Sequence, residues 1–236
     1  QDGMDTLDGG AGNDDLSGGG DDDVMVGQDG MDTLDGGAGN DAMAGGGDDD
    51  AMLGQDGMDT LDGGAGNDDM SGGGDDDVML GQDGMDTLDG GAGNDDMSGG
   101  GDDDVMVGQD GMDSLSGGPG EDVIDGGAGE DELGEMADAD FDLGDNSLVT
   151  DDGNGVVETD VLTDVEAANI EGGAGNNTVD ASDFNGDVSL SGNEGDDALI
   201  GGFGDDVLDG GIGNDDMAGG DGDDAMLGQD GMDTLD

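Results

Sequence analysis

The chain has 236 residues, of which 68 are Asp or Glu, and it contains no Lys, Arg or His. A chain without positive charge cannot displace the counterions of a phosphate backbone, which excludes nucleic-acid binding, and its charge disfavours anionic membrane surfaces. Because Cys, His, Lys, Tyr and Arg are all missing, disulfides, zinc–thiolate sites, nucleophilic triads and Schiff bases are excluded, and we expect no enzyme activity.

Low hydrophobicity with a high net charge is typical of disordered chains, but the 60 glycines recur in nine-residue units. The units GGAGNDDLS, GGGDDDVMV and GQDGMDTLD follow one another from residue 9, and the cycle then repeats with variations. Position 1 of each unit is Gly, position 6 is Asp, and position 8 is Leu, Met or Ile. We predict a nonapeptide array over 1–134, an irregular β-solenoid insert over 135–191 with one degenerate repeat at 172–180, and a second array over 192–236.

The first six residues of each unit favour turns, and the last three favour a short strand. Two nonapeptides then form one coil, and stacked coils form an all-β, right-handed parallel β-roll, or β-solenoid, with position 8 facing inward. Leu7, Leu16, Met25, Leu34, Met43 and their successors are the predicted core. In the insert we predict these inward residues: Val161, Leu162, Val165, Ile170, Val179, Val188 and Leu190, with Phe141 and Phe184 filling the wider coils.

Stacking places the position-6 carboxylates of successive coils roughly 4.8 Å apart along each edge of the roll. Each close pair repels by about 1 kcal/mol even in water, and the thin core cannot offset the sum, so the metal-free chain should not fold. Ca²⁺ accepts carboxylate and backbone carbonyl oxygens, whereas Mg²⁺ demands tighter geometry and transition metals prefer nitrogen or sulfur. The predicted ligands are Asp5, Asp14, Asp23, Asp32, Asp41, Asp50, Asp59, Asp68, Asp77, Asp86, Asp95, Asp104, Asp113, Asp122, Asp131, Asp197, Asp206, Asp215, Asp224 and Asp233.

The pattern GGxGxDxUx, in which U is apolar, resembles the RTX (hemolysin-type calcium-binding) nonapeptide. Units 9–17, 36–44, 63–71, 90–98, 126–134, 201–209 and 210–218 match it through position 6. The resemblance implies that each Ca²⁺ lies between loops one coil apart, bound by two position-6 Asp residues and by loop carbonyls. The implied pairs are Asp5 with Asp23, Asp14 with Asp32, Asp23 with Asp41, and onward. It also implies type I export into calcium-rich extracellular surroundings or to the cell surface.

Several residues depart from this pattern. Gln replaces the second Gly in GQDGMDTLD, and Asn177 replaces the ligand Asp at 172–180, which should weaken that site. The segment 138–146 is either a second calcium loop or, as we favour, a solvated acidic turn. Position 4 is Asp in the GGGDDDVMV-type units, where it adds a ligand or, as we favour, faces water; these residues are Asp21, Asp48, Asp75 and Asp102.

The near-identical repetition favours a structural role: a secreted, calcium-stiffened segment of a surface, matrix, adhesin or filament protein. Outward apolar side chains at positions 7 and 9, such as Val24, Leu53 and Val78, suggest self-association of rolls. The alternative is a calcium-binding C-terminal or spacer region of a larger secreted enzyme or toxin whose active domain lies outside this chain. Ice binding is disfavoured because no continuous row of Thr exists, and mineral nucleation has no specific signal.

Overall fold

The fold is known from a computed structural model that describes residues 3–236, and these residues form β-strands and no helix. The chain divides into two compact units, Gln1–Asp131 and Glu132–Asp236. Strands two apart in sequence pair in parallel, each residue with the one two nonapeptides later, as in Leu7 with Met25. The predicted parallel β-solenoid with two nonapeptides per coil is therefore confirmed. No helix within residues 3–236 is long and apolar enough to cross a membrane.

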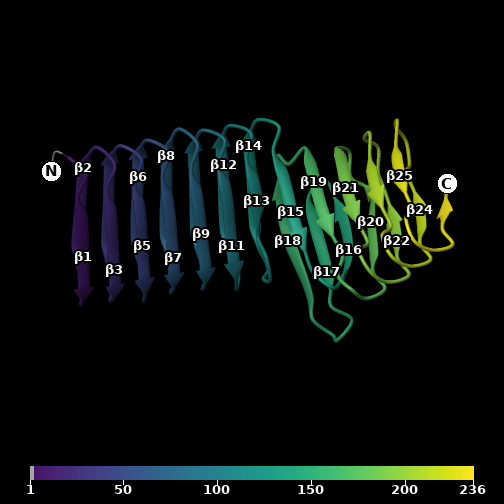
Figure 1. The fold of residues 1–236 in the computed structure, drawn as a ribbon, viewed down its shortest axis with the longest axis horizontal. Coiled ribbons are helices and arrows are strands. Elements are labelled where there is room, and N and C mark those ends of the chain that lie inside the picture. The colour runs from purple at the N-terminus through teal and green to yellow at the C-terminus, as the bar shows by residue number, and fades with distance from the viewer. Residues whose placement is uncertain (1–2) are drawn as a thin grey trace. The chain divides into compact units, whose positions relative to one another are not determined.

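The first unit has two parallel sheets whose strands alternate along the chain, in the orders β1-β3-β5-β7-β9-β11-β13 and β2-β4-β6-β8-β10-β12-β14 (Figure 1, purple to teal). Its strands are β1 (Thr6–Ala11), β2 (Asp15–Gly20), β3 (Val24–Asp29), β4 (Thr33–Ala38), β5 (Ala42–Gly47), β6 (Ala51–Asp56), β7 (Thr60–Ala65), β8 (Asp69–Gly74), β9 (Val78–Asp83), β10 (Thr87–Ala92), β11 (Asp96–Gly101), β12 (Val105–Asp110), β13 (Ser114–Ser116) and β14 (Val123–Ala128).

Most of these strands are six residues long, twice the predicted length. Each continues through positions 1 to 3 of the next unit, so that Gly19 pairs with Gly37 and Gly20 with Ala38. The glycines at position 2 have positive φ, as at Gly37 (105°), which only a residue without Cβ adopts freely. Glycine therefore extends the sheet as well as forming the turn, and the loop shrinks to positions 4 to 6.

The core is the predicted line of position-8 side chains. Met25, Leu34, Met52 and Leu61 are fully buried, whereas Leu7 and Leu16 in the first coil are half-buried. Neighbours on each strand point outward because side chains alternate across a sheet. Each nonapeptide of the first unit thus contributes one large side chain to the core.

The second unit also contains two sheets, ordered β15-β19-β21-β23-β25 and β18-β17-β16-β20-β22-β24-β26. Its strands are β15 (Glu132–Met136), β16 (Asp140–Gly144), β17 (Ser147–Asp151), β18 (Val157–Thr163), β19 (Ala167–Glu171), β20 (Thr178–Asp183), β21 (Asp187–Ser191), β22 (Ala198–Ile200), β23 (Val207–Asp209), β24 (Asp216–Ala218), β25 (Ala225–Leu227) and β26 (Thr234–Leu235). Strands β16, β17 and β18 form an antiparallel meander, whereas β16 pairs with β20 in parallel.

Most of the inward residues predicted for the insert are buried, on the meander and on the strands that follow it. Leu162, Ile170, Val179, Val188 and Leu190 are buried, as are Phe141 and Phe184. Val161 was predicted to face inward, and this is wrong: it is 50% exposed because its neighbour Leu162 takes the inward direction of β18. Val165 lies beyond the end of β18 and is half-buried.

The thin core makes each position-8 side chain important for stability. Replacing Leu61 by Ala should lower the free energy of unfolding by about 2–5 kcal/mol. The core has no second layer of side chains that could move in to fill the cavity. The control Met43→Leu preserves volume at a position where other units carry Leu, and should cost less than about 1.5 kcal/mol. Thermal or denaturant unfolding followed by circular dichroism measures both; equal losses would contradict a core of single side chains.

Candidate metal-binding site

The position-6 aspartates form what we call the inner ladders, one along each edge of the roll. The backbone N–H of each Asp donates to Oδ1 of the Asp one coil later, for example Asp5 to Asp23 (2.6 Å), Asp23 to Asp41 (2.7 Å) and Asp14 to Asp32 (2.7 Å). The same contact recurs along the first unit until Asp104 donates to Asp122 (2.8 Å) and Asp113 to Asp131 (2.9 Å). The structure therefore brings together the residues of each implied pair.

The second unit carries shorter inner ladders. On one edge Asn177 donates to Asp197 (2.8 Å) and Asp197 to Asp215 (2.9 Å). On the other edge Val188 donates to Asp206 (2.9 Å) and Asp206 to Asp224 (3.1 Å).

The predicted ligands are held within the loops rather than on the surface. Half-buried are Asp5, Asp14, Asp224 and Asp233, all near the ends of the two arrays. At most 3% exposed are Asp23, Asp32, Asp41, Asp50, Asp59, Asp68, Asp77, Asp86, Asp95, Asp104, Asp113, Asp122, Asp131, Asp197, Asp206 and Asp215.

The second carboxylate oxygen distinguishes these residues from ordinary structural aspartates. Buried polar atoms nearly always have a hydrogen-bond partner, and an exception requires an explanation such as an ion. Asp206 is partly satisfied, since its Oδ2 accepts from the N–H of Gly202 (2.8 Å). Oδ2 is buried and accepts no hydrogen bond in Asp5, Asp14, Asp23, Asp32, Asp41, Asp50, Asp59, Asp68, Asp77, Asp86, Asp95, Asp104, Asp113, Asp197 and Asp215.

The glycine at position 1 shows where this oxygen points. A Cβ built on Gly9 would lie 2.9 Å from Oδ2 of Asp14 and 3.0 Å from the carbonyl oxygen of Gly27, one coil later. At Gly72 the same Cβ would clash with Oδ2 of Asp77 and lie 2.8 Å from the carbonyl oxygen of Gly90. A bare carboxylate oxygen and a carbonyl oxygen therefore face the same small space, which the missing side chain keeps open.

Burial and crowding disfavour the charged form of the inner ladders. Desolvation is the main cause that raises the pKa of Asp77 and Asp104 to about 7, and neighbouring carboxylates add to it. The pKa of Asp59, Asp95 and other inner-ladder residues rises to about 6 for the same reasons. In each case the backbone N–H bond to Oδ1 opposes the rise without cancelling it.

The donor set fits a hard cation. Within residues 3–236 no group of three or more carboxylates is arranged to hold a metal. An inner ladder offers carboxylate oxygens together with backbone carbonyl oxygens, as beside Gly9 and Gly72, and Ca²⁺ accepts both. The residues present supply both, so they fit the predicted ion.

The two departures at positions 2 and 4 both have left-handed backbone. Asp21, Asp48, Asp75 and Asp102 have φ of 71° to 73° and are exposed, in agreement with the water-facing interpretation. Asp tolerates this conformation better than most residues.

Gln at position 2 also has positive φ, for example 81° at Gln28, and its side chain makes a contact that sequence reasoning missed. Its Nε2 donates to an Asp at position 9 of the preceding coil; the pairs are Gln28 with Asp8, Gln55 with Asp35, Gln82 with Asp62, Gln109 with Asp89, and Gln229 with Asp209.

Position 5 carries a second set of contacts that was not predicted, which we call the outer ladders. The N–H of Asn40 donates to Asp22 (3.0 Å), and the N–H of Met58 donates to Asn40 (3.1 Å). Here the acceptor lies in the preceding coil, whereas in the inner ladders it lies in the following coil. The ordered recurrence of Asp, Asn and Met at position 5 was the signal available in the sequence.

The acidic segment 138–146 is tied to the following coil by hydrogen bonds from backbone N–H groups. It contains β16, and its carboxylates accept backbone hydrogen bonds: Asp140 from Thr178 (2.6 Å) and Asp145 from Asn185 (2.8 Å). The carboxylates of Asp138, Asp140, Asp142 and Asp145 are exposed, in agreement with the solvated interpretation, but residues 140–144 are a strand rather than a turn. Asp140 and Asp145 also hold the meander against the following coil.

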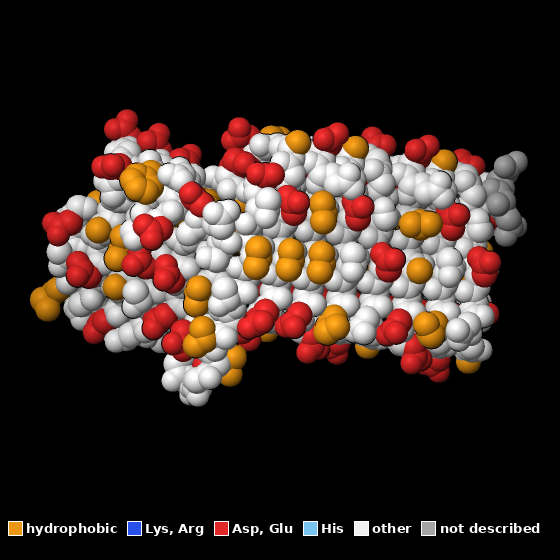
Figure 2. Space-filling view, turned by 180° about the vertical axis from the view of Figure 1, so that it is seen from behind, with side chains coloured by type: hydrophobic (Ala, Val, Ile, Leu, Met, Phe, Trp, Pro, Cys, Tyr) orange, Lys and Arg blue, Asp and Glu red, His pale blue; other side chains and the backbone are white. Residues whose placement is uncertain are grey.

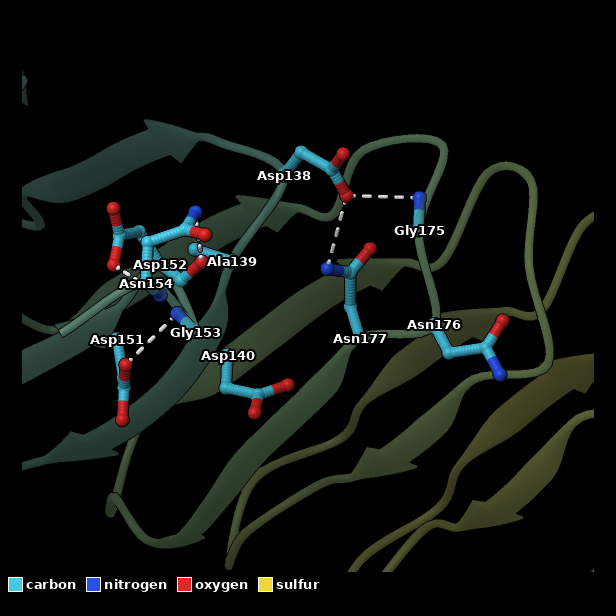
Figure 3. A pocket seen from close by; sticks show the side chains of 10 residues that line it. All are labelled: Asp138, Ala139, Asp140, Asp151, Asp152, Gly153, Asn154, Gly175, Asn176 and Asn177. Atoms are coloured by element: carbon cyan, nitrogen blue, oxygen red, sulfur yellow. Dashed lines mark hydrogen bonds between the residues drawn. The ribbon is translucent and has the colours of Figure 1, made fainter.

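A pocket lies beside this segment, and its carboxylates already have donors. Asp138 accepts from the N–H of Gly175 (2.8 Å) and from the amide of Asn177 (3.3 Å), as Figure 3 shows. Asp152 accepts from the N–H groups of Asn154 (2.8 Å) and Val156 (3.1 Å), which lower its pKa. Oδ1 of Asn177 also accepts from the N–H of Gly173 (3.0 Å), so this oxygen has a donor, unlike most Oδ2 atoms of the inner ladders.

A family model for the RTX calcium-binding nonapeptide repeat (4 copies) matches residues 1–33, 17–52, 26–61, 53–84, 71–106, 80–115, 107–133, 169–188 and 191–226. These matches span well over half of the chain, so the chain belongs to the RTX calcium-binding nonapeptide-repeat family. Its repeats imply Ca²⁺ as the ligand. No curated protein matched the chain.

The space beside the position-1 glycine can be tested with a matched pair in one nonapeptide. Gly72→Ala places a methyl group against Oδ2 of Asp77 and the Gly90 carbonyl, and should remove calcium binding at that loop. Gly74→Ala, two residues away, meets only the Gln55 carbonyl oxygen at 3.8 Å and should bind as the parent does. Isothermal titration calorimetry measures the number of ions bound; equal stoichiometry in the two variants would contradict this site.

The raised pKa values predict that acid partly replaces the cation. The pKa of Asp in an unfolded chain is about 3.9, whereas the pKa values of Asp77 and Asp104 in the folded chain are about 7. The ion-free folded state therefore binds more protons than the unfolded chain between roughly pH 4 and 7. The free energy of unfolding of the ion-free chain therefore rises as the pH falls through this window, and the gain is lost as the pH rises through the folded pKa values. Circular dichroism in a chelator at pH 7.5 and pH 4.5 measures this, with sedimentation as the check for precipitation near the pI. A strand signal unchanged by pH would contradict it.

Proposed function

We propose that this chain is a calcium-binding structural segment of a secreted or cell-surface protein, and that it folds and stiffens when Ca²⁺ fills the inner ladders. The ligands we propose are the twenty position-6 aspartates of the two arrays together with the position-1 carbonyls that face them. The observation that carries the proposal is the row of buried Oδ2 atoms that accept no hydrogen bond.

The energy balance supports folding that depends on the ion. A buried carboxylate that faces another oxygen is strongly disfavoured unless a cation compensates it. A divalent ion that joins two coils turns this repulsion into a crosslink, and because the site exists only when the coils are stacked, binding free energy becomes folding free energy. Asp77 and Asp104, whose pKa values rise furthest, lie within the array, where each has a neighbour on both sides.

The repetition supports a mechanical role better than a catalytic one. Each coil adds roughly 4.8 Å along the stacking direction, and every coil of the first unit offers the same kind of site, so the segment acts as a spacer whose stiffness follows the calcium concentration. Calcium is abundant outside cells, which fits the export that is typical of the family.

Exposed apolar side chains on the outward sides of both sheets support contact between copies. On the face shown in Figure 2, apolar side chains lie among acidic ones. Val24 and Leu80 on the sheet of β3 and β9, and Leu53 on the sheet of β6, are 38–46% exposed. Exposed apolar side chains mark a contact surface where they form a contiguous patch. We propose that calcium-filled rolls associate through these positions.

A calcium titration followed by circular dichroism tests the function, with Mg²⁺ as the ion control. Asp77→Asn removes one charged ligand and should raise the midpoint calcium concentration, because a charge-assisted contact of roughly 1.5 kcal/mol is lost. The rise should be smaller than the tenfold that about 1.4 kcal/mol gives for a single ion, because many ions share the folding transition. Asp75→Asn makes the same change two residues away at an exposed position and should leave the midpoint unchanged.

Two results would count against the proposal. Strand signal that is equally strong in a chelator at neutral pH would remove the link between calcium and folding. A calcium form that stays monomeric in sedimentation and electron microscopy would remove only the association of rolls.

A further inference from the structure

The methionines of this chain form two sets with opposite environments. Six lie at position 5 of the loops and are 54–82% exposed; these loop methionines are Met4, Met31, Met58, Met85, Met112 and Met232. Eight lie at position 8 and are at most 3% exposed; these core methionines are Met25, Met43, Met52, Met70, Met79, Met97, Met106 and Met217. Two others, Met136 and Met226, belong to neither set.

The core methionines stack on apolar side chains of the neighbouring coils, several of which are also methionines. Met25 pairs with Met43 and Met52 with Met70 in the parallel registers of the two sheets. The backbone on either side of them is committed to hydrogen bonds between strands, so the core offers no free donor to a new oxygen atom. A polar group on these side chains would be buried without a partner.

Oxidation supplies such a group. The thioether sulfur attacks one oxygen of a peroxide, the O–O bond breaks, and the sulfur is oxidised by two electrons to a sulfoxide while the peroxide is reduced to water. Loop methionines are accessible to this reaction in the folded protein. Core methionines are accessible only when the coils separate.

Loop oxidation should leave the fold intact. The N–H of Met58 that donates to Asn40 belongs to the backbone, so the outer ladder does not depend on the thioether. Position 5 also accepts Asn, as at Asn40 and Asn67, so a polar side chain is tolerated there.

We propose that the core methionines are a set of oxidation sites gated by calcium. This rests on the proposed function, because calcium holds the coils together. With Ca²⁺ bound, a peroxide oxidises only exposed methionines and the roll persists. Without Ca²⁺, the core methionines are oxidised as well, and the sulfoxides prevent the coils from stacking again when calcium returns.

The test treats the full chain with hydrogen peroxide in calcium and in a chelator, maps the sulfoxides by mass spectrometry, removes the peroxide and then adds calcium. In the calcium sample, which keeps its strand signal, we expect oxidation of the loop methionines and of the exposed Met136, and none of the core methionines. In the chelator sample we expect oxidation of both sets and loss of the calcium-induced strand signal.

Two variants separate the sets. The first replaces every core methionine, and Met226, by Leu, the residue that other units carry at position 8, as at Leu34; after oxidation in chelator it should fold with calcium. The second changes Met31, Met58, Met85 and Met112 to Asn. After oxidation in chelator it should lose calcium-induced folding, as the oxidised parent does. Both are compared with their own unoxidised samples.

An untreated sample titrated in parallel separates this inference from the proposed function. If untreated chain folds without calcium, the proposed function fails and the gate fails with it. If untreated chain folds only with calcium but the fully oxidised chain does so equally well, the oxidation inference alone is overturned. Equal oxidation of core methionines in calcium and in chelator overturns it too.

Discussion

The structure depends on one arrangement: a carboxylate whose two oxygens have different surroundings. Oδ1 of an inner-ladder Asp accepts a backbone N–H from the coil before it, which aligns the coils and stabilises the charge. In most of these residues Oδ2 faces a carbonyl oxygen and has no donor. The first oxygen makes the ladder possible. The second is the basis of the proposed dependence on a cation, because two facing acceptors repel unless positive charge lies between them.

The degenerate repeat shows what the chain looks like where this dependence is removed. Asn177 occupies the place of an inner-ladder Asp, and its backbone N–H still donates to Asp197. Its side-chain oxygen, however, accepts from Gly173, and its amide donates to Asp138. One neutral side chain therefore closes the position with protein atoms alone, beside the meander where the regular coils are interrupted.

The longer repeat, which spans three nonapeptides, acts through the outer contacts rather than through the core. Because a coil uses two nonapeptides and the cycle uses three, Asp, Asn and Met follow one another in successive coils along each edge at position 5. Asp and Asn accept a hydrogen bond there and Met cannot, so each outer ladder has short runs that end at a methionine. The inner ladders are continuous over the same coils. The single nonapeptide therefore sets the spacing of the inner-ladder aspartates, and the longer repeat sets the outer contacts.

The sequence by itself determined the period, the coil of two nonapeptides, the line of core side chains and the aspartates that approach one another, because these follow from spacing and from the alternation of side chains on a strand. Only the tertiary structure decided which carboxylate oxygen lacks a donor, why position 1 has no room for a side chain, and that Gln28 reaches Asp8. It also decided the antiparallel meander and the pairing of Asp140 and Asp145 with the following coil. These features depend on contacts between different coils or between segments that lie far apart in the chain. The local spacing of residues does not determine such contacts.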